Sequence, residues 1–289
     1  NVTCRKDSLD MDDIGYLIGP LLNSGGRLGE SKTSFEFIIE QNKENINTIF
    51  ERLTLLNQKR KEIGNKAYEE AVHEIENHQK EEEFLFYYSA NIIQGITGAI
   101  ATKVSRNFKK PSFVFYIDEK NNEVVGSGRS FQNVDILMVL NDMKHIFSRF
   151  GGHKKACGMT LPFEALEELI QYIRENGKNY IIKEEEMLFY DIEINPQFIN
   201  WNLVKELNKL YPFGPDNEQP IFLSRKLTPF QCKKIGKKQN HLKFKIKENP
   251  KLDFIGWNMA EKEDIVKHTQ FDILYQLQEN YFNNNVYLQ

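Results

Sequence analysis

A long run of helical periodicity constrains the fold of this chain more than any other feature. From Lys43 to about Lys80, apolar residues recur three, four or seven positions apart, with charged residues between them. This spacing predicts one long helix, with Gly64 as the place where an interruption is expected if there is one. At about 1.5 Å per residue the helix would extend roughly 55 Å, which is longer than a small domain needs. We therefore expect it to connect domains.

The segments on either side of this helix differ in pattern. Residues 1–40 contain helical pieces that we expect to be broken by Pro20 and by Gly25–Gly26. After the charged run at 80–83, the pattern alternates between strands (84–90, 112–118, 123–130, 156–162) and helices (96–108, 134–149, 164–175). From residue 187 short strands follow one another, apart from a short helix at 202–210. The sequence therefore predicts an α/β domain with a mixed sheet, followed by a small OB-type β-barrel.

Composition excludes several classes of protein. The 289 residues are 40% hydrophobic, but they include no apolar run of about 18 residues and no basic-then-apolar leader. We therefore expect a cytoplasmic protein with no membrane association. The three cysteines are widely separated, which argues against disulfides and against a zinc site. The chain begins with Asn1 instead of Met, and we expect it to be a piece of a longer protein.

Recognisable catalytic and metal-binding patterns are absent from the sequence. The acidic group Asp10, Asp12 and Asp13 precedes an apolar helical pattern and is more simply explained as a helix N-terminus. We expect no catalytic residue and no metal site in this chain.

Three glycine-containing stretches could bind an anion. "QGITGAI" at 94–100 opens a helix, where free N–H groups favour a phosphate, although small residues there also serve close packing. "GSGRS" at 126–130 ends a strand and carries an arginine, although a simple turn would look the same. "RFGGHKKACG" at 149–158 is either a helix stop or an anion loop. Loops at strand ends converge in α/β units, so we expect the three stretches to bind one phosphate. The predicted contacts are Thr97, Ser127, Arg129, Ser130, Gly151, Gly152 and His153.

The last predicted domain carries a local excess of positive charge. Between Arg225 and Lys247 there are nine Lys or Arg residues and no Asp or Glu. The excess predicts nucleic-acid binding, whereas the alternative is a solvated face over a core. A strand at 241–247 would place its charged residues on one face and its apolar residues on the other. The predicted contacts are Lys233, Lys234, Lys237, Lys238, His241, Lys243 and Lys245.

The order of these motifs resembles one family. "IGPLLNSGGRLGES", the long helix, "QGITGAIATKV", "KKPSFVFY", "GSGRS", "FGGHKKACGMTL", "LYPFGPDNEQPIF" and "HLKFKI" occur in the order typical of RecJ, a family of 5′ to 3′ exonucleases specific for single-stranded DNA. The resemblance covers nearly the whole chain. It implies the tail of a DHH catalytic domain at 1–40, a connecting helix at 41–83, a DHH-associated substrate-binding domain at 84–178, and an OB domain at 187–289 that lacks its final strand.

The resemblance also implies roles for individual residues. Asn23 and Arg27 match the motif at the edge of the active-site cleft, while Arg129 and His153 match the residues that grip the phosphates of the 5′-terminal nucleotides. Lys103 stands where the family often has arginine, which keeps the charge but loses the bidentate fork. Ile92–Ile93 stands where the family often has Trp-His.

The implied activity belongs to the parent protein. That protein is expected to cut single-stranded DNA in repair and recombination, with Mg²⁺ or Mn²⁺ held by an N-terminal domain outside this chain. The chain alone is expected to bind DNA as a monomer without cutting it, with a helicase or a single-strand-binding protein as candidate partners. Two alternatives remain open: a DHH-superfamily enzyme that degrades short RNAs or cyclic dinucleotides, and a non-catalytic single-strand-binding module.

Overall fold

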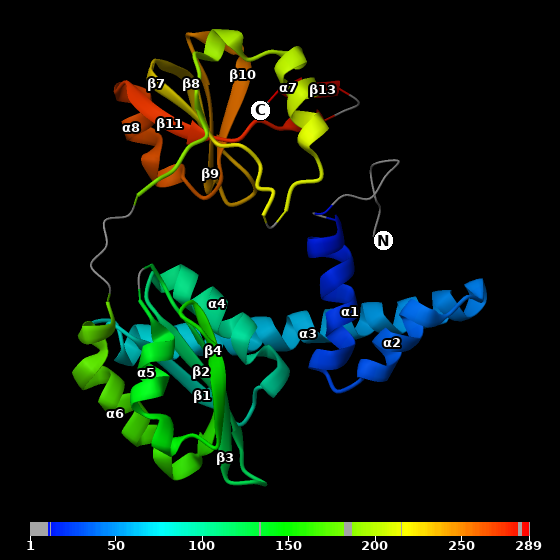
Figure 1. Ribbon diagram of the computed structural model, residues 1–289, viewed down its shortest axis with the longest axis vertical. Coiled ribbons are helices and arrows are strands. Elements are labelled where there is room, and N and C mark those ends of the chain that lie inside the picture. Colours follow the sequence, from blue (N-terminus) through cyan, green and yellow to red (C-terminus); the bar gives the residue numbers. More distant parts are fainter. Residues whose placement is uncertain are drawn as a thin grey trace. The chain divides into compact units, whose positions relative to one another are not determined.

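The computed structural model describes residues 11, 13–132, 134–181, 187–214, 216–282 and 285–288. The chain divides into two compact units, Asn1–Glu185 and Glu186–Gln289, which are described separately (Figure 1). The first unit combines helices with one mixed sheet, and the second is built mainly from short strands. This arrangement confirms the predicted fold class.

The long helix is confirmed as α3, Lys43–His78, and it continues through Gly64 without interruption. Its first turn is capped by Asn42, whose side chain accepts the backbone N–H groups of Glu44 and Asn45. The helix contributes to two separate hydrophobic clusters. Near its start, Leu53 and Leu56 pack against the N-terminal helices. Near its end, Ala67, Ala71 and Ile75 pack beneath the sheet.

The N-terminal segment differs from its prediction at the glycine pair. It contains the π-helix η1 (Asp13–Ile18), α1 (Gly19–Arg27) and α2 (Ser31–Ile39). Pro20 lies in the first turn of α1, but the expected break at Gly25–Gly26 is wrong because α1 continues to Arg27. A Cβ at Gly25 would lie 2.3 Å from Ser34 Oγ and 2.7 Å from the backbone oxygen of Glu30. The glycine therefore allows α2 to fold back closely against α1.

A five-stranded mixed sheet forms the centre of the first unit. Its order is β1-β2-β3-β5-β4, in which β1 and β2 run parallel and every other neighbouring pair is antiparallel. The strands are β1 (Leu85–Ser89), β2 (Ser112–Asp118), β3 (Glu123–Arg129), β4 (Arg149–His153) and β5 (Ala156–Pro162). The short β2–β3 and β4–β5 connections explain why these pairs are antiparallel.

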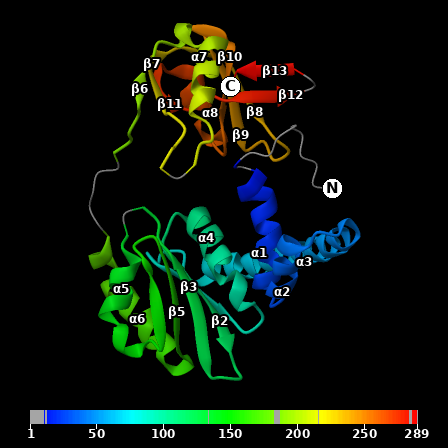
Figure 2. The ribbon, with the colours of Figure 1, turned by 45° about the vertical axis from the view of Figure 1, so that its right-hand side comes forward.

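Helices cover both faces of this sheet (Figures 1 and 2). On one face, α3 and α4 (Thr97–Phe108) bury Leu85 and Val114. On the other face, α5 (Ile136–Asp142) and α6 (Leu166–Asn176) bury Phe113 and Phe115. Alternate residues of a strand therefore enter different cores. The short helices of this unit are η2 (Gln94–Ile96), η3 (Lys144–Ile146), η4 (Phe163–Ala165) and η5 (Gly177–Tyr180).

The predicted helix at 134–149 is wrong in its second half. The helix α5 ends at Asp142 and is followed by η3, and Arg149 already begins strand β4. Phe150 packs against the core on the α5 and α6 face, and β4 pairs with β5 along its whole length. The backbone hydrogen bonds of this hairpin are incompatible with a continued helix. Gly151 and Gly152 therefore lie within a strand and do not stop a helix.

A side chain closes one edge of the sheet. The amide of Gln79, just after α3, donates from Nε2 to the backbone oxygen of Phe86 at 2.7 Å and accepts from its N–H at 2.8 Å. Gln79 is buried, so these bonds are shielded from water. The amide thus pairs with β1 as a neighbouring peptide group would.

The second unit packs two three-stranded sheets around one hydrophobic core. Their orders are β10-β9-β8 and β11-β7-β6, and β12 pairs with β13. The strands are β6 (Ile192–Glu193), β7 (Phe222–Leu227), β8 (Pro229–Ile235), β9 (His241–Ile246), β10 (Asn249–Gly256), β11 (Phe271–Tyr275), β12 (Glu279–Phe282) and β13 (Asn285–Leu288). The helices are η6 (Pro196–Phe198), α7 (Trp201–Leu207), η7 (Asn208–Leu210), η8 (Ala260–Lys262) and α8 (Glu263–His268). None of the described helices of either unit is long and apolar enough to cross a membrane.

Candidate nucleic-acid interface

The start of α4 lies against the end of β3. The hydroxyl groups of Thr97 and Ser127 are 2.9 Å apart and share a hydrogen bond. Further along α4, Ser105 Oγ donates to the backbone oxygen of Ser130. These contacts bring "QGITGAI" and "GSGRS" together, and the second stretch ends strand β3, as predicted.

Two hydrogen bonds and the space beside a glycine determine the position of Arg129. Its Nε donates to Thr102 Oγ1 at 3.2 Å, and its Nη1 donates to the backbone oxygen of Gly128 at 2.8 Å. A Cβ at Gly98 would lie 2.7 Å from Arg129 Nη2, so the glycine leaves the space that the guanidinium occupies. Burial lowers the pKa of the Arg129 guanidinium, and the charge of Arg27 lowers it further, while Cys157 acts in the opposite direction.

Two more arginines belong to the same group. Arg27, the last residue of α1, donates from Nη1 to the backbone oxygen of Gly95 at 2.6 Å. Arg60, on α3, donates from Nε and Nη2 to Asn57 Oδ1. Burial lowers the pKa of the Arg60 guanidinium, and the charge of Arg27 lowers it further. We call Arg27, Arg60 and Arg129 the arginine cluster.

The positive charge of the arginine cluster is not balanced by ion pairs within the described part of the chain. Among the described residues, no Asp or Glu forms an ion pair with any of its three members. Guanidinium groups that are partly buried and repel one another are stabilised by an anion, and their planar forks match phosphate and carboxylate oxygens. The cluster therefore has the chemistry of an anion-binding site.

Strand pairing places the histidine stretch on the same side of the sheet as the arginine cluster. In register across β3, β5 and β4, Arg129 lies opposite Ala156 and Ala156 opposite His153. Two residues further along each strand, Ser127, Gly158 and Gly151 are aligned in the same way. Side chains in such rows lie on one face, here the face that carries α4. Because neighbouring strands are about 4.8 Å apart, Arg129 and His153 are separated by roughly 10 Å at their Cα atoms.

The floor between Arg129 and His153 is made of small residues. Ala156 has one methyl group, and Gly151 and Gly158 have no side chain, so the strand backbone is accessible there. A Cβ at Gly151 would meet nothing within 4 Å, and one at Gly158 would meet a single backbone oxygen at 3.9 Å. We call this area of β4 and β5 the open face. It can accept a ligand in direct contact with the backbone.

The two neighbouring glycines serve different purposes. Gly152 has φ +145°, and a Cβ there would lie 2.3 Å from the backbone oxygen of Ala156. Gly152 is therefore required by the close approach of β4 and β5. Gly151 meets no such constraint, so space for a ligand remains the better explanation for its missing side chain.

His153 is exposed at the end of β4, with one ring nitrogen fixed by the backbone. Its Nδ1 accepts the N–H of Lys155 at 3.3 Å across the hairpin turn. The tautomer consistent with this bond carries its proton on Nε2, which is then free to donate to a ligand. The hairpin thus positions a donor beside the open face.

Three other predicted residues lie in different surroundings. Lys103 donates to Asn65 Oδ1 on α3 at 2.9 Å, while its neighbour Thr102 contacts Arg129. Ser130 donates to the backbone oxygen of Val134 and so stabilises the chain leaving β3. Asn23 is exposed on α1, four residues before Arg27. The roles of Lys103 and Ser130 in phosphate binding, and of Asn23 at the edge of the active-site cleft, remain predictions.

Much of the positive charge predicted for the second unit is paired in space. Lys243 Nζ and Lys245 Nζ flank the carboxylate of Asp253, at 2.9 and 3.8 Å respectively. Lys234 pairs with Glu263 in the same way, at 3.4 Å. The acidic partners come from β10 and α8, beyond the stretch in which the sequence shows no Asp or Glu. The alternation predicted for 241–247 is confirmed over β9, whose residues are alternately buried and partly exposed.

The remaining charges gather near the β8–β9 connection. Lys233, Lys237 and Lys238 are exposed, and among the described residues none of them forms an ion pair. Trp257, at the end of β10, has 62% of its surface exposed. Its ring packs edge-on against His241, with centroids 4.9 Å apart, and His241 Nδ1 accepts the N–H of Asn258. Asn258 Oδ1 in turn accepts a hydrogen bond from Asn240, which fixes the connection beside the tryptophan.

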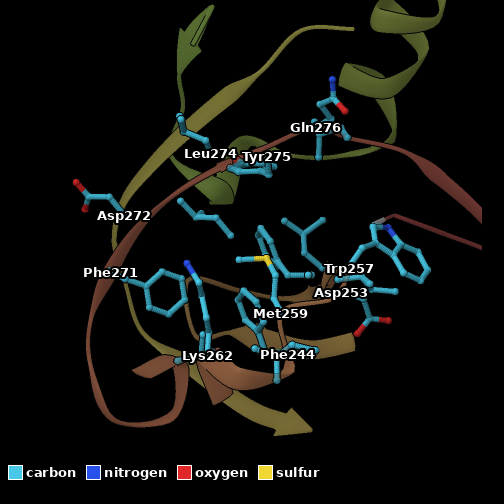
Figure 3. Close-up of a pocket in the computed structure, with 18 of the residues that line it drawn as sticks. Phe244, Asp253, Trp257, Met259, Lys262, Phe271, Asp272, Leu274, Tyr275 and Gln276 are labelled. Atoms are coloured by element: carbon cyan, nitrogen blue, oxygen red, sulfur yellow. The ribbon is translucent and has the colours of Figure 1, made fainter. Parts of the chain in front are cut away.

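An apolar pocket of about 440 Å³ lies beside Trp257 (Figure 3). Residues of β10 and β11 line it together with the segment around η8. In Figure 3, Phe271 and Trp257 lie on opposite sides of the pocket, with Phe244 and Met259 between them. Trp257 therefore presents an aromatic surface beside this hollow, next to His241 at the end of the β8–β9 connection.

Among the described residues, no group of three or more His, Cys, Asp or Glu side chains could hold a metal ion.

Sequence reasoning missed several residues of this interface. Arg60 and Thr102 are single polar positions on amphipathic helices, and nothing in their local sequence distinguishes them from other surface residues. Gly158 and Ala156 were assigned only to a strand, although an alternating small-residue pattern could have indicated an open face. Trp257 could have been found as one of two tryptophans in the chain.

Comparison with known proteins places these two units in a family. Residues 81–179 match the model of the DHHA1 domain, and residues 190–289 match the model of the RecJ OB domain. The single-stranded-DNA-specific exonuclease RecJ of Bacillus subtilis is 26% identical over 277 residues, which cover 94% of this chain and 35% of that protein. The protein of the same name from Escherichia coli is 25% identical, over 97% of this chain and 50% of that protein.

Solved structures show the same fold. The crystal structure of RecJ in complex with Mn²⁺ from Thermus thermophilus aligns with a TM-score of 0.79 at 18% identity, over 97% of this chain and 40% of that one. The corresponding structure with Mg²⁺ aligns with a TM-score of 0.76. The chain spans half or less of the length of these curated relatives. With a DHHA1 domain followed by a RecJ OB domain, and with RecJ sequences matching it almost from end to end, the chain belongs to the RecJ family and corresponds to the DHHA1 and OB part of such a protein.

Proposed function

We propose that this chain is the substrate-binding part of a 5′ to 3′ exonuclease specific for single-stranded DNA, acting in DNA repair and recombination in the cytoplasm. The first unit would grip phosphates near the 5′ end, and the second would guide the strand. The proposed activity rests on the names of the relatives, which are single-stranded-DNA-specific exonucleases. The proposed DNA binding rests on the residues of this chain.

The observation that carries the proposal is the arginine cluster beside the open face. Three partly buried guanidinium groups that have no acidic partner in the described part of the chain, next to a floor of small residues, are suited to a phosphodiester backbone. His153 Nε2 would add a donor on the far side of the floor. A backbone phosphate needs charge and hydrogen bonds but no base-specific contact, which suits an enzyme that degrades DNA of any sequence.

The second unit supports a single-stranded substrate. Exposed lysines beside an exposed tryptophan are the combination by which proteins bind unpaired nucleotides, because phosphates meet the cations while bases stack on the ring. Bases in a duplex are already stacked on one another and cannot cover Trp257 in this way. Lys233, Lys237 and Lys238 are therefore the cations we propose for strand guidance in this unit.

Cleavage is assigned to a part of the protein outside the described residues. The Thermus relatives were crystallised with Mg²⁺ or Mn²⁺, and we propose that the complete protein uses one of these ions, bound by a catalytic domain that precedes this chain. Such an ion would stabilise negative charge at the scissile phosphate. The chain itself is expected to be a monomer that binds without cutting. A helicase or a single-strand-binding protein would supply its substrate.

A binding experiment tests this proposal. The purified chain should bind a fluorescently labelled single-stranded oligonucleotide of twenty thymidines more tightly than a duplex of equal length, and the affinity should fall steeply with salt. Arg129→Ala should weaken binding by about 1 to 3 kcal/mol because a charged hydrogen bond is lost. Tighter binding to a cyclic dinucleotide than to the oligonucleotide would instead favour a dinucleotide phosphodiesterase. Mn²⁺-dependent cleavage by the chain alone would contradict the assignment of the metal site.

A further inference from the structure

A further arginine lies on the open face outside the arginine cluster. Arg149 is the first residue of β4 and is exposed. Among the described residues, it forms no ion pair and no side-chain hydrogen bond. Its charge is therefore available to a ligand, and the phosphate contacts proposed above make no use of it.

The register of the sheet fixes the face on which Arg149 lies. It is paired with Thr160 of β5, and Thr160 is paired with Val125 of β3. Phe150, the next residue, packs into the core on the α5 and α6 side of the sheet. Because side chains alternate along a strand, Arg149 shares the opposite face with Gly151 and His153.

The spacing along β4 is set by the strand itself. Residues two apart on a strand are separated by about 6.6 Å, so Arg149 lies roughly 13 Å from His153 along the same edge. Between them stands Gly151, where even a Cβ would meet nothing within 4 Å. The floor beside it, at Gly158, is equally bare. A ligand lying along β4 would therefore meet His153, then open backbone, then the guanidinium of Arg149.

We propose that Arg149 binds a second backbone phosphate of the same nucleic-acid strand, farther along β4 than the phosphate held by Arg129 and His153. This inference rests on the proposed function, since it requires that a phosphodiester chain occupy the open face. It adds a length requirement: a strand of several nucleotides reaches both positions, whereas a dinucleotide placed at Arg129 and His153 does not reach Arg149. The residue therefore favours oligonucleotides over very short products.

The experiment compares two ligands with two arginine variants of the whole chain. A 5′-phosphorylated thymidine octanucleotide is measured by fluorescence polarisation, and the 5′-phosphorylated dinucleotide by competition against it. Arg149→Ala should weaken octanucleotide binding by about tenfold and leave dinucleotide binding unchanged. Arg129→Ala should weaken both. The slope of log affinity against log salt for the octanucleotide should become shallower by about 0.7 in Arg149→Ala, since one phosphate contact is lost.

Matched controls separate this role from a general effect of charge. Lys120→Ala removes one positive charge from the exposed β2–β3 turn of the same unit and should change neither affinity. Arg149→Lys keeps the charge and should recover most of the octanucleotide affinity. Circular dichroism and thermal unfolding of each variant establish that the fold is retained.

Each outcome decides between the two proposals. An Arg149→Ala variant that binds the octanucleotide like the parent, or that loses as much affinity for the dinucleotide as for the octanucleotide, overturns the second phosphate site while leaving the proposed function intact. Loss of affinity in Lys120→Ala equal to that in Arg149→Ala also overturns it. A parent chain that binds neither ligand overturns the proposed function, and the inference with it.

Discussion

The guanidinium of Arg129 occupies the space that a side chain at Gly98 would need. A Cβ at Gly98 would lie 2.7 Å from Arg129 Nη2 and 3.4 Å from Ser127 Oγ. The glycine of α4 therefore determines where the arginine of β3 can lie. This relationship connects two motifs that are about thirty residues apart in the chain and makes the position of Arg129 sensitive to one methyl group.

Gly98→Ala is expected to weaken single-strand binding without weakening the fold. The added methyl group displaces the end of a flexible side chain, which costs little, and alanine stabilises a helix by roughly 0.5 to 1 kcal/mol relative to glycine. Displacement of Arg129 should reduce affinity by about tenfold. Fluorescence polarisation and thermal unfolding measure the two effects. Equal affinity in variant and parent would contradict the proposed role of Arg129.

Replacing the two glycines of β4 should separate folding from binding. Gly152→Ala should lower the free energy of unfolding by about 3 kcal/mol, because the residue has φ +145° and its Cβ would overlap Ala156. Gly151→Ala should leave stability unchanged and weaken binding, since its methyl group would project into the space proposed for the ligand. Urea unfolding monitored by circular dichroism, together with a binding titration, measures both. Gly151→Ala with full affinity would argue against a ligand on the open face.

Asp253→Asn should strengthen single-strand binding. The carboxylate holds Lys243 and Lys245, so its neutralisation releases two cations for phosphates. We expect affinity to rise by about threefold and its salt dependence to steepen. Asp272→Asn is the matched control, because Arg225 keeps Glu193 as a partner when Asp272 is neutralised. The same increase in both variants would show that only net charge matters.

Trp257→Ala should weaken binding of single strands by about 1 to 3 kcal/mol, the usual loss when a base loses its stacking partner. Trp257→Phe should recover part of this loss because it keeps an aromatic face. The ring is largely exposed, so the thermal midpoint should change little. Fluorescence titration with an oligonucleotide measures the effect. Unchanged affinity in the alanine variant would exclude Trp257 from the interface.

The buried thiol of Cys157 should make the first unit less stable in alkali. Burial raises the pKa of this thiol from 9.0 to about 12. Above about pH 9 the unfolded chain loses the proton while the folded chain keeps it, so the contribution of this group to stability falls as pH rises towards 12. The thermal midpoint of the parent should therefore drop more between about pH 8 and pH 10.5 than that of Cys157→Ala. An equal drop in thermal midpoint for the parent and for Cys157→Ala would show that the thiol does not contribute to the loss of stability in alkali.

Periodicity predicted the elements in which one face is consistently buried. The helix α3 repeats its apolar residues along its whole length, and β9 alternates without exception, so both could be recognised without tertiary contacts. The strand β4 could not, because "RFGGH" contains two glycines and one partly buried ring, and its strand character depends on pairing with β5. The order of strands in the sheet likewise depends on contacts between distant segments.

The site was predictable in its motifs but not in its charge balance. Arg129 and His153 stand beside glycines that mark them in the sequence, whereas Arg60 joins the arginine cluster only because α3 passes beside α1. The nine positive residues from Arg225 to Lys247 appear unopposed in the sequence, yet Asp253 and Glu263 reach several of them in space. The composition of a short stretch does not reveal acidic residues that lie later in the sequence but beside that stretch in the folded protein.

The side-chain amide of Gln79 gives the sheet of the first unit two unlike edges. By pairing with Phe86, it occupies positions on β1 to which another extended chain would have to bind, so that edge resists further strand addition and the aggregation that follows from it. The opposite edge, β4, has a partner strand on one side alone in the described part of the chain. A further strand is thus hindered from pairing with β1, whereas β4, which contains Gly151 and Gly152, keeps peptide groups exposed at its edge. It is along β4 that the phosphate chain is proposed to lie.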